Sequence, residues 1–139
     1  MPHNLQRFLS AQEYDYPIAL REIQNGCKQS HWIWYIFPQI KGLGRSYQSE
    51  YYGIDNRQEA EAYLAEPILN ARLREITLAL LEHKDQTAEQ ILGRIDAMKV
   101  KSSMTLFDAI TPNDIYADAL NTFFAGKRCN RTLEYLQRA

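Results

Sequence analysis

The chain has 139 residues, of which 45% are hydrophobic and 24% charged, and its formal net charge is −1. This length corresponds to one domain, whose core is large enough to fold without a disulfide or a metal. The balanced charge favours neither nucleic acid nor a membrane surface as a partner, and no apolar run approaches the ~18 residues of a membrane span.

The cysteines and the start of the chain indicate the cellular compartment. Cys27 and Cys129 lie far apart in the sequence and belong to no Cys-x-x-Cys motif, and the chain has three histidines. The first residues lack the basic and apolar pattern of a signal peptide. We therefore expect a cytoplasmic protein with reduced cysteines, no structural zinc and no cofactor.

The first part of the chain shows helical spacing of its apolar residues. One helix is predicted over residues 5–12, after the cap Asn4. A second helix is predicted to open with Pro17 in its first turn and to stop at Asn25-Gly26. Residues 41–55 contain half of the six glycines of the chain, so this region is predicted to be irregular.

Six further helices are predicted in the second part of the chain. Each opens with an N-cap, a capping box or a proline in its first turn, or continues an apolar periodicity. They run from Asp55 or Asn56 to Leu64, over residues 67–81, from a Thr87-Gln90 capping box to Gly93, over residues 96–110, from a cap at Thr111-Pro112-Asn113-Asp114 to Gly126, and from the cap Asn130 through Leu136.

No stretch alternates in the manner of a strand for more than a few residues, and no repeat or linker divides the chain. The sequence therefore predicts one all-α domain over residues 1–139. Several short helices are expected to surround a central Trp-rich segment.

That central segment, residues 28–39, reads KQSHWIWYIFPQ and contains both tryptophans. Every residue between the first tryptophan and Pro38 is apolar or aromatic, which predicts a place in the middle of the core. Residues 30–37 are expected to form a short buried helix with Ser30 as its N-cap. A buried strand is the competing interpretation.

The aromatic residues of this block allow two interpretations. In the first, which we favour for most of them, they pack in the core, Trp34 included. In the second, a tryptophan or Tyr35 lines a pocket and stacks on a planar ligand beside Lys28, His31 and Arg45.

Several motifs carry a family resemblance. They are Leu5-Gln6-Arg7-Phe8, residues 26–44 with Ser30-His31-Trp32-Ile33-Trp34 and Phe37-Pro38-Gln39, Glu59-Ala60-x-Ala62-Tyr63-Leu64, Lys101-Ser102-Ser103-Met104-Thr105-Leu106-Phe107, and Thr132-Leu133. With them the chain resembles, over nearly its whole length, a bacterial family known as a domain of unknown function (DUF1810), whose members are sometimes mislabelled calpastatin. The resemblance implies a single all-α domain and assigns no activity, substrate or catalytic residue.

His31 is the candidate for acid–base catalysis, because histidine exchanges a proton near neutral pH. The alternative is a histidine that holds the start of a helix by hydrogen bonding. No Ser-His-Asp or Cys-His pairing is visible in the local sequence.

Three further segments combine basic residues with glycine or hydroxyl residues. The segment Gly42-x-Gly44-Arg45-Ser46 is either a weak anion-binding loop or a tight turn. The segment Lys99-Val100-Lys101-Ser102-Ser103 is expected to contain a helix N-cap, where Lys101 and serine N–H groups can hold a phosphate or carboxylate. Residues 126–132 form a basic cluster that is either a solvated face or an anion contact.

Two functional hypotheses follow. In the first, a pocket beside residues 30–39 binds a small anionic ligand such as a nucleotide derivative, with or without acid–base chemistry by His31. Lys101 would hold the anion, so it should lie near His31 in the fold. The expected ligand-binding residues are Lys28, Trp32, Gln39, Arg45, Lys101, Ser102 and Ser103, with no metal. In the second hypothesis, a non-catalytic helical module docks a protein partner through Tyr47, Tyr51 and Tyr52.

Overall fold

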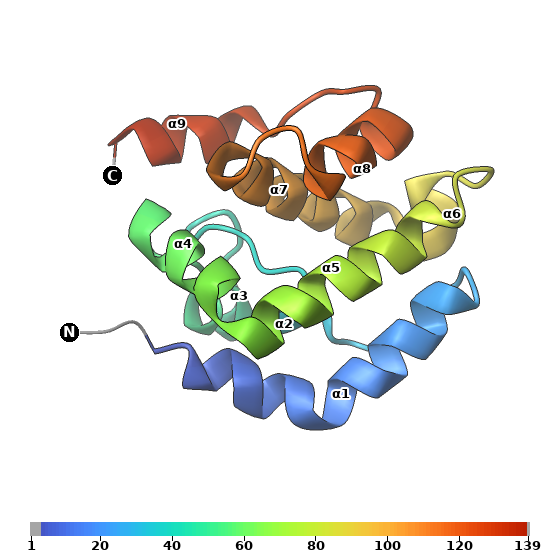
Figure 1. The fold of residues 1–139 in the computed structure, drawn as a ribbon, viewed down its shortest axis with the longest axis horizontal. Helices are drawn as coiled ribbons and strands as arrows, with labels where there is room; N and C mark the ends of the chain where they lie inside the picture. Colours follow the sequence, from blue (N-terminus) through green and yellow to red (C-terminus); the bar gives the residue numbers. More distant parts are fainter. Residues whose placement is uncertain (1–3, 139) are drawn as a thin grey trace.

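The computed structural model describes residues 4–138, and all regular secondary structure in that range is helical. The elements, drawn in Figure 1, are α1 (Gln6–Gln24), α2 (Ile33–Ile36), α3 (Tyr47–Tyr51), α4 (Arg57–Ala65), α5 (Pro67–Leu81), α6 (Ala88–Leu92), α7 (Arg94–Ile110), α8 (Ile115–Phe124) and α9 (Asn130–Arg138). An isolated parallel bridge joins Ile40 to Ile54. The predicted all-α fold is confirmed.

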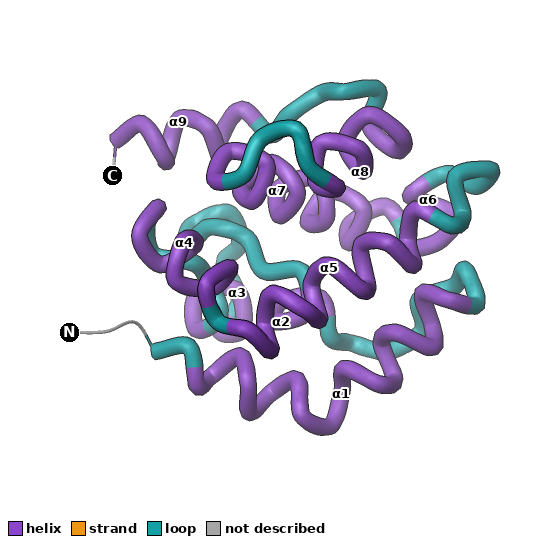
Figure 2. The backbone as a smooth tube through the Cα atoms, in the orientation of Figure 1, coloured by secondary structure: helices purple, strands orange, loops and turns teal. Residues whose placement is uncertain are grey.

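The long helices enclose one hydrophobic core. Helix α5 packs against α1 on one side and α8 on the other, and α8 packs on α7 (Figure 1). The connection between α2 and α3 is drawn as loop in Figure 2, yet its residues Phe37 and Ile40 are buried in that core. The Trp-rich segment therefore lies centrally, as predicted.

Helix α1 is continuous, and the prediction of two separate helices in this region is wrong. Pro17 lies inside α1 rather than opening a helix. A proline has no N–H to donate to the carbonyl four residues earlier, so it normally bends a helix rather than extending it straight. Here Pro17 faces solvent, where the released carbonyl can bind water, and Figure 1 shows α1 bending near its middle.

The caps of three helices follow the prediction. Asn56 caps α4, Pro67 stands in the first turn of α5, and Thr87 forms the capping box of α6 with Gln90. Asn56 and Thr87 accept backbone N–H groups that have no partner within the helix, whereas Pro67 has no N–H that would need one.

Three other predicted boundaries are wrong. Helix α8 is capped by Asp114, three residues beyond the expected start, because its carboxylate accepts the Ile115 N–H. Asn130 is the first residue of α9, and the Leu133 N–H bonds to the carbonyl of Cys129. The region predicted as irregular contains helix α3, which Ser46 caps.

Arg7, near the start of α1, binds both the end of α3 and helix α4 to α1. Its Nε donates to the Tyr51 carbonyl at 2.8 Å, its Nη2 donates to the Gly53 carbonyl at 3.0 Å, and its Nη1 lies 3.0 Å from Glu59 Oε2. The Arg7 and Glu59 side chains are 7% and 5% exposed. The pair thus connects α1, the end of α3 and α4 through buried charges.

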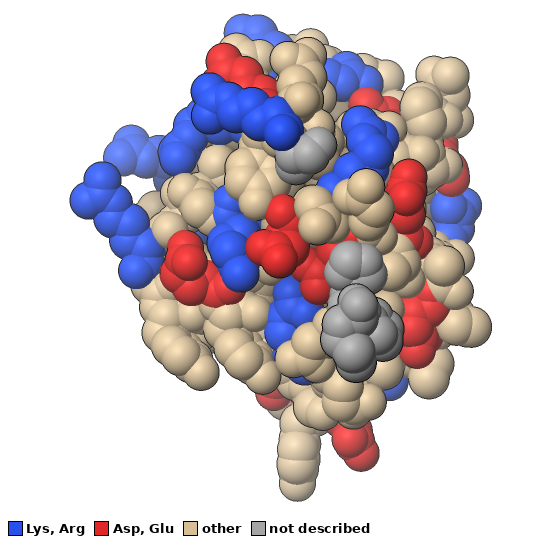
Figure 3. Space-filling model, turned by 90° about the vertical axis from the view of Figure 1, so that its left-hand side faces the viewer, with Lys and Arg blue, Asp and Glu red and all other residues tan. Residues whose placement is uncertain are grey.

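The surface agrees with the balanced composition. On the face drawn in Figure 3, acidic and basic side chains lie next to one another. None of the helices within residues 4–138 combines the length and the apolar character that crossing a membrane requires.

Candidate functional site

The segment before α2 is held by hydrogen bonds that it donates to α1, and Ser30 is not the N-cap that the sequence predicts. Helix α2 spans four residues, and its N-cap position falls at Trp32, which makes no side-chain cap bond. The Ser30 hydroxyl donates instead to Glu22 Oε2 at 2.5 Å. Because α2 begins only at Ile33, Ser30 lies two residues before the cap position and its oxygen does not accept an N–H of that helix.

Glu22 organises this segment through four donors. Its Oε1 accepts the N–H groups of Gln29 and Ser30 at 2.8 and 2.9 Å and the Trp32 indole N–H at 3.0 Å. Partial burial alone would raise the pKa of Glu22. The hydrogen bonds from Ser30, Gln29 and Trp32 outweigh it and lower the pKa from 4.5 to about 2.

The two tryptophans have different environments. Trp32 is 1% exposed and packs against Phe37, with the Lys28 ammonium 4.8 Å from its ring centroid. Trp34 is half-buried and packs against the edge of the core, so the expectation that it lies within the core is met only in part. Two residues further along the helical turn, Trp34 points to nearly the opposite side from Trp32. There it lines a cavity.

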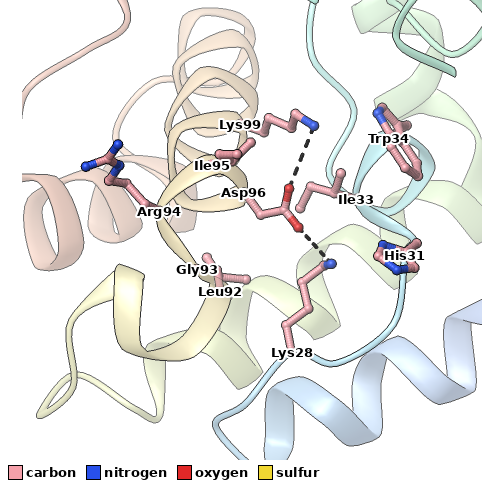
Figure 4. Close-up of a pocket in the computed structure, with 10 residues that line it drawn as sticks. All are labelled: Lys28, His31, Ile33, Trp34, Leu92, Gly93, Arg94, Ile95, Asp96 and Lys99. Carbon is pink, nitrogen blue, oxygen red and sulfur yellow. Dashed lines mark ion pairs between the residues drawn. The ribbon is translucent and has the colours of Figure 1, made fainter. Parts of the chain in front are cut away.

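This cavity, here called the Trp34 cavity, has a volume of about 530 Å³ and lies between the segment before α2 and the start of α7 (Figure 4). Its polar lining residues are Lys28, His31, Arg94, Asp96 and Lys99, and Ile33, Trp34, Leu92, Gly93 and Ile95 complete its wall. Volumes of this size accommodate small-molecule ligands.

The charges in the cavity are arranged around one carboxylate. Asp96 lies 2.7 Å from Lys28 Nζ and 3.7 Å from Lys99 Nζ, and both ammonium groups point toward it in Figure 4. Arg94 points away from them there, and it has no ion-pair partner among residues 4–138. Two cations, Lys28 and Lys99, therefore face one anion.

Two further features border the cavity. Gly93 occupies the N-cap position of α7, with φ +83° and no side chain to cap the first N–H groups of the helix. The Lys99 ammonium lies 5.2 Å from the centroid of the Trp34 ring, within cation–π range. Both the helix start and the aromatic face therefore lie beside basic side chains.

Comparison with known proteins identifies the family. The sequence model of the family described as "Protein of unknown function (DUF1810)" matches residues 2–136. The chain belongs to the DUF1810 family. Its structure is similar to the crystal structure of the conserved hypothetical protein Rv1873 from Mycobacterium tuberculosis, with a TM-score of 0.95 and 37% sequence identity over 99% of both chains. No curated protein matches the chain.

The residues predicted for a site in this DUF1810 protein are divided among different surroundings. Lys28 and His31 line the Trp34 cavity, whereas Gln39 and Ser102 line a second cavity. Trp32 is buried in the core and its indole N–H is bound by Glu22. Arg45 is exposed.

The segment with Lys101, Ser102 and Ser103 does not begin a helix, so the predicted N-cap there is wrong. All three residues lie inside α7, where backbone N–H groups are bonded within the helix. The Ser102 hydroxyl donates to the Met98 carbonyl at 3.2 Å, and Ser103 is fully buried. Lys101 is not among the residues that line the Trp34 cavity with His31.

Sequence reasoning missed Glu22, Asp96 and Lys99. Asp96 and Lys99 have the i,i+3 spacing that places an acid and a base side by side on a helix, and this signal is visible in the sequence. Glu22 has no local signal, since its four donors come from the next segment of the chain.

A test of the Glu22 arrangement is its pH dependence. Glu22→Gln removes the charge, and we expect a loss of about 1.5–3 kcal/mol in the free energy of unfolding at neutral pH, typical of hydrogen bonds to a charged group. The folded pKa of about 2 lies below 4.5, so the stabilisation is complete above pH 4.5 and is lost as pH falls toward 2. Denaturant titrations should show the difference between wild type and variant shrinking over that interval. A difference that is constant with pH would contradict the assignment.

Proposed function

We propose that the Trp34 cavity binds a small anionic ligand with a planar portion, such as a nucleotide derivative. The observation that supports this is the excess of cations, since the ammonium groups of Lys28 and Lys99 face one carboxylate, Asp96, in a cavity of about 530 Å³. A concave site with one sign of charge in excess attracts ligands of the opposite sign.

The anionic group of the ligand would lie between Lys99 and the start of α7. Lys28 is already close to Asp96 at 2.7 Å and donates to the Ser30 carbonyl at 2.5 Å, so it positions the carboxylate and the loop. Lys99 is 3.7 Å from Asp96 and is less tightly held. The uncapped N–H groups after Gly93 offer further donors to an oxyanion.

The planar part of the ligand would lie against Trp34. A half-buried indole offers an aromatic face that stacks on a base or another flat ring. The Lys99 ammonium already lies over this ring, so one cation can contact both the aromatic wall and the anion. A nucleotide derivative combines the two groups that this arrangement favours.

His31 is the residue of the cavity suited to proton transfer, because histidine gains and loses a proton near neutral pH. Its side chain is exposed beside Trp34 and Lys28 (Figure 4). Acid–base chemistry in this site would use His31 at the mouth of the cavity, with Lys99 stabilising negative charge.

Thermal-shift measurements test the proposal. Adenosine monophosphate should raise the melting temperature more than adenosine or inorganic phosphate, because it supplies both the ring and the anion. A ligand at 100 times its dissociation constant stabilises the native state by about 2.7 kcal/mol. Lys99→Met should abolish the shift, whereas Lys84→Met, an equal loss of charge at an exposed position outside the cavity, should retain it.

Fluorescence gives a second readout. In the variant Trp32→Phe, Trp34 is the remaining tryptophan of the chain, so a ligand that stacks on it should change the emission. The proposal fails if nucleotides, sugar phosphates and metabolite acids all leave both the melting temperature and this emission unchanged.

The second candidate function is a protein-interaction module, and its supporting observation is a pair of tyrosines. Tyr47 and Tyr51 are 75% and 43% exposed, and their rings stack with centroids 5.7 Å apart. Tyrosines of this kind are enriched at interfaces. A partner that binds there would be lost with Tyr47→Ser and retained with Lys99→Met, the reverse of the pattern expected for the ligand.

A further inference from the structure

A second cavity, here called the Cys129 cavity, lies on the other side of Lys99. Its volume is about 350 Å³, and Ile95 and Lys99 belong to the lining of both cavities. Its other polar lining residues are Gln39, Ser102, Cys129 and Arg131. The proposed anion site does not account for these residues.

The backbone of Cys129 is fixed at the start of α9, where this helix packs on α7. The Cys129 N–H donates to Thr105 Oγ1 at 3.0 Å, and this hydroxyl donates in turn to the Lys101 carbonyl at 2.8 Å. The Cys129 carbonyl accepts the Leu133 N–H at 3.2 Å, so Cys129 occupies the cap position of α9. The residue is half-buried, with its backbone fixed at both groups.

Polar groups around the sulfur favour its ionised form. Burial alone would raise the pKa of Cys129, but the hydroxyls of Ser102 and Thr132 and the N–H groups of Thr132 and Arg131 lower it. Thr132 Oγ1 is fully buried and makes no hydrogen bond with residues 4–138, so its proton is available to a thiolate. The Ser102 hydroxyl has one proton, which it donates to the Met98 carbonyl. When the sulfur ionises, the hydroxyl can donate that proton to the thiolate instead.

Gln39 supplies the cavity with a free polar group. It is 8% exposed and lines the cavity, and its side-chain amide makes no hydrogen bond within residues 4–138. The amide atoms of this largely buried residue stay accessible and unpaired, so they are free to bind a polar group that enters the cavity. The amide can donate to a carboxylate and accept from a protonated group.

The charges facing the cavity are basic. Lys99 lies on one side and Arg131 on the other, where the Arg131 guanidinium is 3.4 Å from the Gly42 carbonyl. The nearby Arg128 is neutralised by Asp108, at 3.0 Å. An anionic reagent is therefore attracted toward the sulfur, whereas a cationic one is repelled.

We propose that the Cys129 cavity is a thiol-modification site that takes small disulfides carrying carboxylates and forms a mixed disulfide with Cys129. Lys99, Arg131 and the Gln39 amide bind the carboxylate, and the N–H groups at the start of α9 face the sulfur. The two proposed sites share Lys99, whereas Cys129, Gln39 and Arg131 line this cavity and not the Trp34 cavity.

The reaction is a thiol–disulfide exchange. Cys129 loses its proton to solvent, and the thiolate attacks one sulfur of the reagent. A new sulfur–sulfur bond forms as the bond within the reagent breaks, and the other half leaves as a thiolate. Cys129 is oxidised to the mixed disulfide and the departing half is reduced, so the reagent itself is the oxidant.

The test compares an anionic and a cationic disulfide at each cysteine. Cys27→Ser leaves Cys129 as the single thiol, and Cys129→Ser leaves the exposed Cys27 as an internal reference. For each cysteine the rate with dithiobis(nitrobenzoate) is divided by the rate with cystamine. This ratio should be about tenfold or more higher for Cys129 than for Cys27, as expected for a cavity lined by charges of one sign. Mass spectrometry identifies the adduct at each position.

Matched variants in the Cys27→Ser background assign the selectivity. Arg131→Met should bring the rate ratio of Cys129 toward that of Cys27, and Gln39→Leu should slow the anionic reagent while leaving the cationic one unchanged. Lys127→Met removes an equal charge at an exposed position outside the cavity and should have no effect. The proposal is wrong if Cys129 shows the same charge preference as Cys27, if it forms no adduct, or if Arg131→Met leaves the ratio unchanged.

Discussion

Replacing Arg7 by methionine should lower the free energy of unfolding by about 3–5 kcal/mol, the range for removing one partner of a buried ion pair. The change leaves the Glu59 carboxylate without its countercharge at 5% exposure and removes the donors to the Tyr51 and Gly53 carbonyls. Urea denaturation followed by circular dichroism measures this difference.

Arg21→Met provides the control for Arg7→Met, because it removes the same charge from an exposed position of α1. Its effect should stay within about 0.5 kcal/mol, as is usual for surface substitutions. If Arg7→Met were equally mild, the buried pair would contribute nothing to stability, and residues 41–55 would be held by apolar contacts instead.

Trp32→Ala should also cost about 3–5 kcal/mol, because it leaves a cavity in a tightly packed core. It also removes one donor from Glu22. Trp34→Ala should cost clearly less, since Trp34 already borders an open cavity. Equilibrium unfolding of the two variants under the same conditions compares them directly.

The contrast between the tryptophans is the informative result of that experiment. A larger loss for Trp34→Ala would mean that Trp34, rather than Trp32, anchors the core, and the Trp34 cavity would then be a poor candidate for a ligand. A proper control for the lost hydrogen bond is Trp32→Phe, which retains most of the buried ring.

The elements that the sequence predicts well are those whose signals are local. The capping box at Thr87 and the proline at the start of α5 act through groups within four residues, so their effect can be recognised in the sequence. Helix α1 was not predicted as one helix, because Pro17 is a residue typical of a helix start and yet lies inside it. The contacts of α1 with α5 and α2 keep it helical through the proline, and such tertiary contacts have no local pattern.

The site was predicted less completely, for a geometric reason. The sequence indicates residues 28–39 as central, and Lys28, His31 and Trp34 of that segment do line a cavity. The opposite wall comes from α7, some sixty residues later. Lys99 and Lys101 differ by two positions on one helix, which turns them to different sides, and choosing between them needs the packing of α7.

Helix α1 carries its two key charges at the ends where its own dipole disfavours them. Arg7 lies near the positive N-terminus and Glu22 near the negative C-terminus. Each charge is stabilised by a segment outside the helix, the first by carbonyls at and just after the end of α3 and the second by N–H groups before α2. The order of the helix and that of the two loops therefore depend on each other. Opening one loop leaves a charge that weakens the helix end, so the three segments form one cooperative unit of folding.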